Sequence, residues 1–363
     1  MIVVDAHQDL AWNMLTFGRD YTLAAAETRS RERGGIAVRE NGDTLLGWPD
    51  YQRGRVAIIF STLFAAPLHT KKGEWDTQAY ADAAEAESLY RAQLDAYHRL
   101  VDENPDKFRL LRTQADLEEH LSAWQEETAT PPVGLVVLME GAEGVRSPAA
   151  LEEWWQRGVR IIGPAWAGTR FCGGTGEPGP LTSEGYELLE AMADIGLTLD
   201  VSHMDEQAVL PALDTYPGAI IASHANAAAL LKDMDSNRFL SDRVIEGLLE
   251  RDGIIGIIPY NRFLLPGWRE NDGRGRVPLD YVVAQIDYIC QMAGNADHVG
   301  IGSDFDGGFG LQKTPAGIDT IADLSKIAPL LAQKGYSEEN IAAILGQNWI
   351  RFLENRLPKG SSL

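Results

Sequence analysis

The chain has 363 residues, 45% of them hydrophobic, and its 53 acidic and 32 basic side chains give a formal net charge of −21. So negative a surface disfavours binding to nucleic-acid phosphates and to anionic membranes. Two cysteines, Cys172 and Cys290, are too few for a disulfide framework, and the sequence shows neither a signal peptide nor an apolar run of about 18 residues. The composition therefore predicts a soluble, cytoplasmic protein.

Eight short apolar runs, many of them rich in β-branched residues, are typical of buried parallel strands. They span residues 2–4, 56–63, 133–139, 159–163, 198–202, 219–223, 254–258 and 299–303. Segments with helical periodicity lie between most of them, among them residues 77–103, 183–195, 241–251 and 337–345. The last three begin with Ser followed closely by an acidic residue, which is a typical signal for a helix N-terminus.

This alternation predicts a parallel sheet with right-handed crossovers, and eight units favour an α/β fold of the (β/α)8 TIM-barrel type over an open doubly wound sheet. No G-x-G-x-x-G follows the first strand, which argues against a dinucleotide-binding fold. Elaborated βα loops are expected at residues 18–50, 166–180 and 262–276, with a mobile, glycine-rich loop over the barrel mouth at 167–176. We expect residues 1–363 to form a single domain, because no linker or internal repeat interrupts the pattern.

Residues able to bind a metal recur just after the predicted strands, where TIM barrels carry their active sites. Each is weak evidence alone, since a Ser-His pair is often a hydrogen-bonded core histidine and a lone carboxylate can cap a helix or turn. Together, three imidazoles and three carboxylates on one rim would be costly unless a cation neutralised them. They are His7 and Asp9 after the first strand, Glu140 after the third, His203 after the fifth, His224 after the sixth and Asp304 after the eighth.

Mixed nitrogen and oxygen ligands favour Zn²⁺, Mn²⁺ or Fe²⁺ over a calcium cage. Six candidate groups exceed the three protein ligands of a single catalytic zinc, so two ions about 3.5 Å apart with a shared carboxylate use them better. Asp304 would then be free as a proton carrier. The other four histidines are expected to be structural or on the surface because of their placement: His69, His98, His120 and His298.

Several short motifs resemble those of the membrane (renal) dipeptidase family of zinc peptidases, within the amidohydrolase superfamily of metal-dependent TIM barrels. The motifs are DAHQD at residues 5–9, EG at 140–141, DVSH at 200–203, ASH at 222–224 and GSDFDG at 302–307. LTSEG at residues 181–185 also resembles the family's segment ahead of the fifth strand. The similarity runs in consistent order from about residue 2 to Asn348.

The resemblance implies a binuclear zinc centre. His7 and Asp9 would bind one Zn²⁺ ion. His203 and His224 would bind the second ion, and Glu140 would bridge both and take part in catalysis. The resemblance also implies a homodimer, whereas the family's membrane anchor has no counterpart here.

The resemblance further implies that Asp304 passes a proton between the bridging water and the leaving amine, and that Arg238 holds the carboxylate of the substrate. A guanidinium suits the second task because it forks onto both oxygens. One departure concerns Trp166, which stands where the family typically has a substrate-polarising histidine. Either the metals stabilise the oxyanion alone, or another donor such as Arg170 substitutes. Tyr260 is also predicted to line the substrate site.

The resulting hypothesis is hydrolysis of a dipeptide-like small molecule with a free carboxylate, including dipeptides with a D-configured C-terminal residue, through a metal-bridging hydroxide. The alternative is a related amidohydrolase acting on N-acyl amino acids, lactams or other small amides, which Trp166 and the glycine-rich loop make worth testing. A non-catalytic metal-binding barrel and a single-metal deaminase fit less well. The non-catalytic barrel is disfavoured because no ligand position is missing. The deaminase is disfavoured because, with a single metal ion, Glu140 would have no second ion to bridge.

Overall fold

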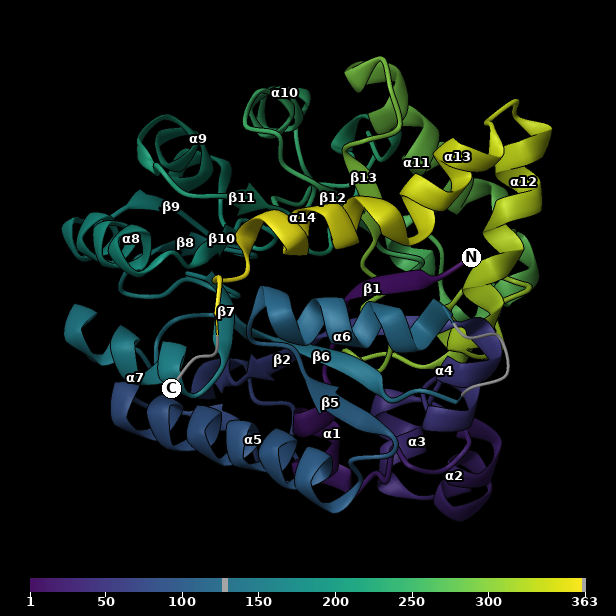
Figure 1. Cartoon of the computed structure of the whole chain (residues 1–363), viewed down its shortest axis with the longest axis horizontal. Helices are drawn as coiled ribbons and strands as arrows, with labels where there is room; N and C mark the ends of the chain where they lie inside the picture. The colour runs from purple at the N-terminus through teal and green to yellow at the C-terminus, as the bar shows by residue number, and fades with distance from the viewer. Residues whose placement is uncertain (126–129, 361–363) are drawn as a thin grey trace.

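The computed structural model describes residues 1–125 and 130–360, and it confirms the (β/α)8 barrel (Figure 1). Neighbouring barrel strands are parallel, in the order β11-β10-β7-β6-β2-β1-β13-β12, and an isolated parallel bridge between Ala222 and Ile255 joins the two ends of this row. The strands are β1 (Val3–Gln8), β2 (Val56–Phe64), β6 (Val133–Glu140), β7 (Val159–Gly163), β10 (Thr198–Asp200), β11 (Ile220–Ile221), β12 (Ile255–Ile257) and β13 (Val299–Ile301).

Each of the eight predicted runs overlaps one barrel strand, and β1, β2 and β6 extend beyond the predicted ends. Their residues are almost entirely buried on both faces, as expected when a parallel sheet is covered by helices outside and filled by side chains inside. One strand of the main sheet was not recognised in the sequence. The strand β5 (Phe108–Leu110) pairs with the first half of β6. On the same edge of β6, the pairing with β7 begins at Val137. The three residues of β5 carry one buried apolar side chain, too weak a pattern to recognise.

The predicted helices are present, with shifted ends. The 77–103 segment is helical only as α5 (Ala83–Glu103), because Asp82 caps that helix and the short strand β4 (Ala79–Tyr80) pairs with β3 (Ala66–Pro67). The helix α8 (Ser183–Ile195) has the predicted bounds, and Ser241 caps α10 (Asp242–Glu250). The 337–345 segment begins as α13 (Glu338–Ala342), then passes through one π-helical turn into α14 (Asn348–Arg356).

The remaining helices surround the strands in Figure 1. They are α1 (Leu10–Phe17), α2 (Ala25–Glu32), α3 (Ile36–Asn41), α4 (Trp48–Gly54), α6 (Gln114–Gln125), α7 (Leu151–Gln156), α9 (Glu206–Thr215), α11 (Asp280–Ala293) and α12 (Ile327–Gln333). Within the described residues, none of the helices has both the length and the apolar composition needed to cross a bilayer.

The long βα loops have structure of their own. Residues 18–50 contain α2 and α3, and residues 262–276 contain short 3-10 turns. The glycine-rich segment 167–176, predicted as a mobile loop, contains β8 (Cys172–Gly174), which forms an antiparallel hairpin with β9 (Glu177–Leu181). Thr175 lies in the turn of this hairpin, and its position matters for the site below.

Candidate metal centre

Two of the predicted ligands lie where β1 meets α1. His7 is within β1, and Asp9 immediately precedes α1, so the extended backbone places both side chains on the same face. Both are buried, at 0% and 5% exposure. The Thr62 hydroxyl on the adjacent strand β2 donates a hydrogen bond to Asp9 Oδ1. Barrel geometry therefore fixes this pair from two neighbouring strands.

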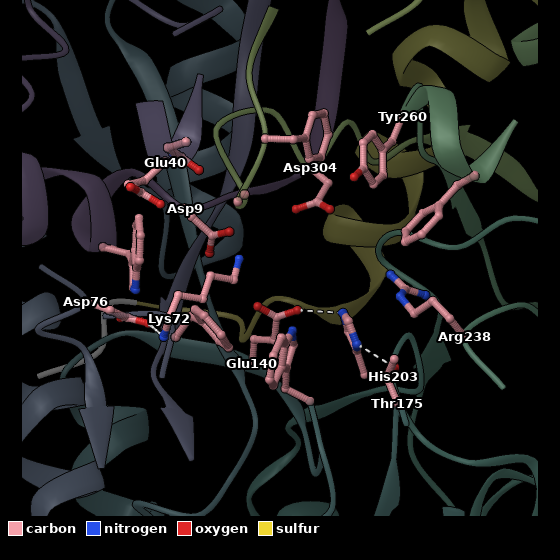
Figure 2. Close-up of a pocket in the computed structure, with 18 of the residues that line it drawn as sticks. Asp9, Glu40, Lys72, Asp76, Glu140, Thr175, His203, Arg238, Tyr260 and Asp304 are labelled. Atoms are coloured by element: carbon pink, nitrogen blue, oxygen red, sulfur yellow. Dashed lines mark hydrogen bonds and ion pairs between the residues drawn. The ribbon is translucent and has the colours of Figure 1, made fainter. Parts of the chain in front are cut away.

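Glu140, the last residue of β6, lies at the centre of three imidazoles. Its Oε1 is 2.9 Å from His203 Nε2 and 3.4 Å from His224 Nε2, and its Oε2 is 3.5 Å from His7 Nε2. Figure 2 shows Glu140 and His203 facing one another across the floor of the cavity. A carboxylate with each oxygen directed at different imidazoles has the geometry of a bridging ligand.

A buried carboxylate behind the rim orients one of these histidines. Asp200, at the end of β10, accepts hydrogen bonds from the Ser202 and Ser223 hydroxyls, each at 2.5 Å. Because Ser223 uses its hydroxyl proton on Asp200, its oxygen is left to accept from His224 Nδ1, 2.9 Å away. His224 Nε2 is then the unprotonated nitrogen, turned toward the centre.

Thr175 plays the corresponding part for His203, since its hydroxyl lies 2.9 Å from His203 Nδ1. The two Nε2 atoms of His203 and His224 then lie only 2.9 Å apart. Burial, helped by the Arg238 charge, lowers the pKa of His203 to about 4, and burial lowers that of His224 well below its usual range. Two neutral imidazoles therefore direct nitrogen atoms at one point beside a carboxylate, as metal ligation requires.

His7 supplies a further test of whether a metal fits. Its Nε2 is buried and has no hydrogen-bond partner, which is costly for a polar atom unless something else binds it. Burial acts to lower the pKa of His7, but the Glu140 carboxylate outweighs that effect and raises the pKa to about 10. Burial and Glu140 together raise the pKa of Asp9 to about 7. Asp9 and Glu140 carry like charges, and a bound cation would relieve the repulsion between them.

The side chains form two overlapping ligand groups. In each group one donor atom per residue lies within 4.8 Å of the others, and the groups are His7 with Glu140 and His224, and His7 with Asp9 and Asp304. His203 joins the first group through its contact with Glu140. The donors fit one or two divalent transition-metal ions on chemical grounds, since they are imidazole nitrogens and carboxylate oxygens.

Asp304 follows β13 in a backbone conformation that few side chains adopt, with φ of 57°. The turn is closed by the backbone, because the Gly307 amide donates to the Asp304 carbonyl at 3.0 Å. The carboxylate is therefore left for the cavity rather than used as a turn cap. A Cβ at Gly307 would collide with the Asp304 carboxylate and come within 2.8 Å of Asp9 Oδ2, so glycine is required here.

Arg238 is buried at 3% exposure, not on the surface as an isolated arginine near a helix start would be. Its Nη1 donates to the Ser202 carbonyl at 2.7 Å, and its Nη2 to the His224 carbonyl at 2.8 Å. Burial lowers its pKa, and the charge of Asp304 opposes that shift. These two backbone contacts hold the guanidinium beside the cavity (Figure 2).

The cavity above the rim has a volume of about 290 Å³. Trp166 and Tyr260 line it as predicted. The Trp166 ring lies 5.1 Å from Phe64 and 6.1 Å from His203 between ring centroids, and Tyr260 stacks on Phe309 at 4.2 Å. Aromatic walls of this kind are common in small-molecule sites.

Arg170 corrects one expectation. Its guanidinium forms ion pairs with Glu143 at 2.8 Å and Glu184 at 3.2 Å, donates to the Val145 carbonyl, and does not line the cavity. Arg170 therefore holds the βα loops together and does not replace the missing histidine.

Sequence reasoning also missed several residues of the site. Asp200 and Ser223 carry a signal that was present in the sequence, because DVSH and ASH place a serine directly before each histidine. Glu40, Lys72 and Asp76 carry no comparable signal. They line the cavity from loops whose path depends on the whole fold.

Comparison with known proteins adds a family assignment. The model of the family described as membrane dipeptidase (peptidase family M19) matches residues 1–358. A Klebsiella pneumoniae protein, named as an uncharacterized protein in the pqqA 5′ region, is 31% identical over 274 residues, which is 72% of this chain and 94% of the relative. Dipeptidase tcpJ of Claviceps purpurea is 28% identical over 323 residues, covering 85% of this chain and 69% of that protein.

Among solved structures, a metallopeptidase from Rhodobacter sphaeroides, liganded with a phosphinate mimic of the dipeptide L-Ala-D-Ala, has a TM-score of 0.75. It is 24% identical in sequence, with 98% of this chain and 99% of that chain covered. At this identity the likeness supports the barrel fold.

Proposed function

The chain belongs to the membrane dipeptidase family, peptidase family M19, and is a metal-dependent dipeptidase. From that premise we propose that it holds two Zn²⁺ ions and hydrolyses dipeptides with a free C-terminal carboxylate. His7 and Asp9 would hold one ion, His203 and His224 the other, and Glu140 both. The observation that carries this proposal is the convergence of three imidazole nitrogens on Glu140, with His7 Nε2 buried and without a hydrogen bond.

The metal ions, when bound, supply Lewis acidity that polarises the substrate carbonyl and makes water nucleophilic at neutral pH. Every other task falls to side chains. Asp304, next to Asp9 and free of the turn's own hydrogen bonds, accepts a proton from the attacking water and delivers it to the leaving nitrogen. Water adds one oxygen to the carbonyl carbon, the C–N bond breaks, and the products are two amino acids.

Arg238 binds the carboxylate of the substrate. Two of its nitrogens are held by backbone carbonyls, which removes the freedom of a long side chain before substrate arrives. A guanidinium fixed at one end of the cavity sets the position of the peptide bond over Glu140. The substrate then extends from Arg238, across the rim, toward the opposite wall.

The stereochemistry of the C-terminal residue is part of the proposal. The Rhodobacter sphaeroides structure holds a mimic of L-Ala-D-Ala, and the two chains share their fold over nearly their full length. We expect this enzyme to accept a D-configured C-terminal residue, since Arg238 recognises the carboxylate and not the side chain.

The test combines metal analysis with a substrate screen. Purified protein should contain about two zinc ions per chain and should hydrolyse Ala-Ala and Ala-D-Ala. Metal-replete protein that cleaves no dipeptide would contradict the substrate assignment. One ion per chain in an active enzyme would contradict the binuclear centre.

A related amidohydrolase activity remains as a second candidate, because Trp166 lines the cavity beside His203 where the family typically has a histidine. Tryptophan donates one N–H and cannot carry a charge. N-acetyl-alanine separates the two activities, since it lacks the free α-amino group of Ala-Ala. Faster hydrolysis of N-acetyl-alanine than of Ala-Ala would favour the second candidate.

A further inference from the structure

One wall of the cavity carries acidic groups that the reaction does not use. Glu40, at the end of α3, and Asp76, between β3 and β4, both line the cavity. In Figure 2 they lie on one side, Arg238 and Tyr260 lie on the other, and Asp9, Glu140 and Asp304 lie between them. A substrate bound through its carboxylate to Arg238 would therefore extend toward Glu40 and Asp76.

Two buried hydrogen-bond acceptors of this wall have no partner. Asp76 is 5% exposed, and its Oδ2 accepts from the Lys72 amide at 3.3 Å, while its buried Oδ1 has no partner. Asn41, 1% exposed and also lining the cavity, has an unpartnered Oδ1 as well. Its amide nitrogen donates to Asn13 Oδ1 and to the Asp306 carbonyl, so the orientation of the amide is fixed. Unmet buried acceptors are costly, and a ligand with several N–H groups would satisfy them.

The charge balance of the wall also favours a cation. Glu40 contacts Arg39 at 3.1 Å, but Arg39 is exposed and such a surface pair is weak. In Figure 2 the Lys72 ammonium group extends toward Asp9 and Glu140, away from Asp76. Two carboxylates thus face the cavity here against a single ammonium group.

Aromatic rings complete the wall. Trp12 and Trp75 both line the cavity and meet edge to face, with 6.3 Å between ring centroids. Phe17 stacks on Trp75 at 5.6 Å and supports it from behind. The indole N–H of Trp12 is the donor of this wall, buried without a partner. Indole faces attract ammonium and guanidinium groups, and a planar guanidinium also stacks on them.

We propose that this wall binds the cationic side chain of the N-terminal residue, so that the enzyme prefers dipeptides beginning with arginine or lysine. The proposal rests on the dipeptidase function proposed above. Asp76 and Asn41 would accept hydrogen bonds from the substrate's guanidinium or ammonium group, Glu40 would neutralise it, and Trp12 and Trp75 would cover its apolar stem.

The test compares Arg-Ala with citrulline-Ala, which has nearly the same shape without the charge. Both carry the same α-ammonium group, so their difference reports the side chain alone. We expect kcat/KM for Arg-Ala to exceed that for citrulline-Ala by about tenfold or more, the range of charged hydrogen bonds. Equal values would overturn the proposal and would assign the wall to the α-ammonium group or to solvent.

Two variants locate the effect. Asp76→Asn and Glu40→Gln should each lower the ratio of the two kcat/KM values by about threefold to tenfold. Glu74→Gln is the matched control, since Glu74 lies on the same loop as Asp76 but is fully exposed and outside the cavity. Glu40 is partly exposed, so Glu40→Gln preserves the test if Asp76→Asn does not fold. Ratios unchanged in Glu40→Gln and in folded Asp76→Asn would overturn the assignment.

Failure of this proposal is distinguishable from failure of the proposed function. Hydrolysis of Ala-Ala and equal rates on Arg-Ala and citrulline-Ala would leave the dipeptidase intact and remove only the basic preference. Absence of hydrolysis with all three dipeptides would contradict the dipeptidase function and this inference together.

Discussion

The metal rim and the acidic wall face the same cavity but are constructed differently. Rim residues such as His7 and Glu140 belong to barrel strands, and His224 is held by hydrogen bonds that end on the buried Asp200. The wall residues Glu40 and Asp76 lie on βα loops, and Asp76 keeps an unpartnered oxygen. The barrel therefore positions the candidate metal ligands, whereas the residues proposed to select the substrate lie on its loops.

The largest effect on activity is expected from changing Glu140, the carboxylate that all three imidazoles contact. Glu140→Gln keeps the shape of the side chain but removes the negative charge that would counter a bound metal. We expect loss of bound metal and a fall in turnover of about three orders of magnitude, checked by metal analysis and Ala-Ala hydrolysis. Glu74→Gln, at a fully exposed position outside the cavity, is the control. A Glu140→Gln enzyme with full metal content and activity would show that Glu140 is no ligand.

A smaller effect is expected from a rim residue that does not bridge. Asp304→Asn removes the proposed proton carrier but leaves an oxygen near Asp9. Turnover should fall by about 10²–10⁴-fold, the usual contribution of general acid–base catalysis, while metal content stays at the wild-type level. Stopped assays on Ala-Ala, with metal analysis of the same sample, measure both quantities. Unchanged kcat would assign the proton transfer to another group.

The smallest effect is expected on the substrate side, at Trp166. Trp166→His restores a side chain that can donate a hydrogen bond and carry a positive charge beside the rim. We expect kcat for Ala-Ala to rise by no more than about tenfold, within the range of one added charged hydrogen bond. Trp166→Phe is the matched control, because it keeps the aromatic ring without an N–H. A fall in Trp166→His, with Trp166→Phe unchanged, would mean that the site does not accept a charged donor there.

The barrel strands and the polar residues at their ends could be predicted from the sequence, because a (β/α)8 barrel repeats the same local pattern in each unit. The apolar runs identified the eight strands, and the His, Glu or Asp residues that follow five of these runs are the six polar residues that the structure brings to one rim. This prediction depends on local pattern and on the parallel topology, and both are visible along the chain.

Features that depend on contacts distant in sequence could not be predicted. Arg170 stands next to the glycine-rich loop, but its partner Glu143 lies 27 residues earlier, and nothing local indicates that pairing. The same holds for Asp76 and Glu40, which meet at one cavity from separate loops. The single domain, the homodimer and the cytoplasmic location stay predictions.

The way the barrel closes links the heat stability of the protein to metal binding. Strands β11 and β12 are joined by one isolated bridge, Ala222 to Ile255, with backbone hydrogen bonds on both sides of it. His224 emerges beside this junction, and His7 lies on β1 in another part of the ring. Ions bound by both side chains would cross-link the barrel independently of the junction, and would stabilise the folded chain by their binding free energy. A chelating buffer would therefore reduce resistance to heat along with activity.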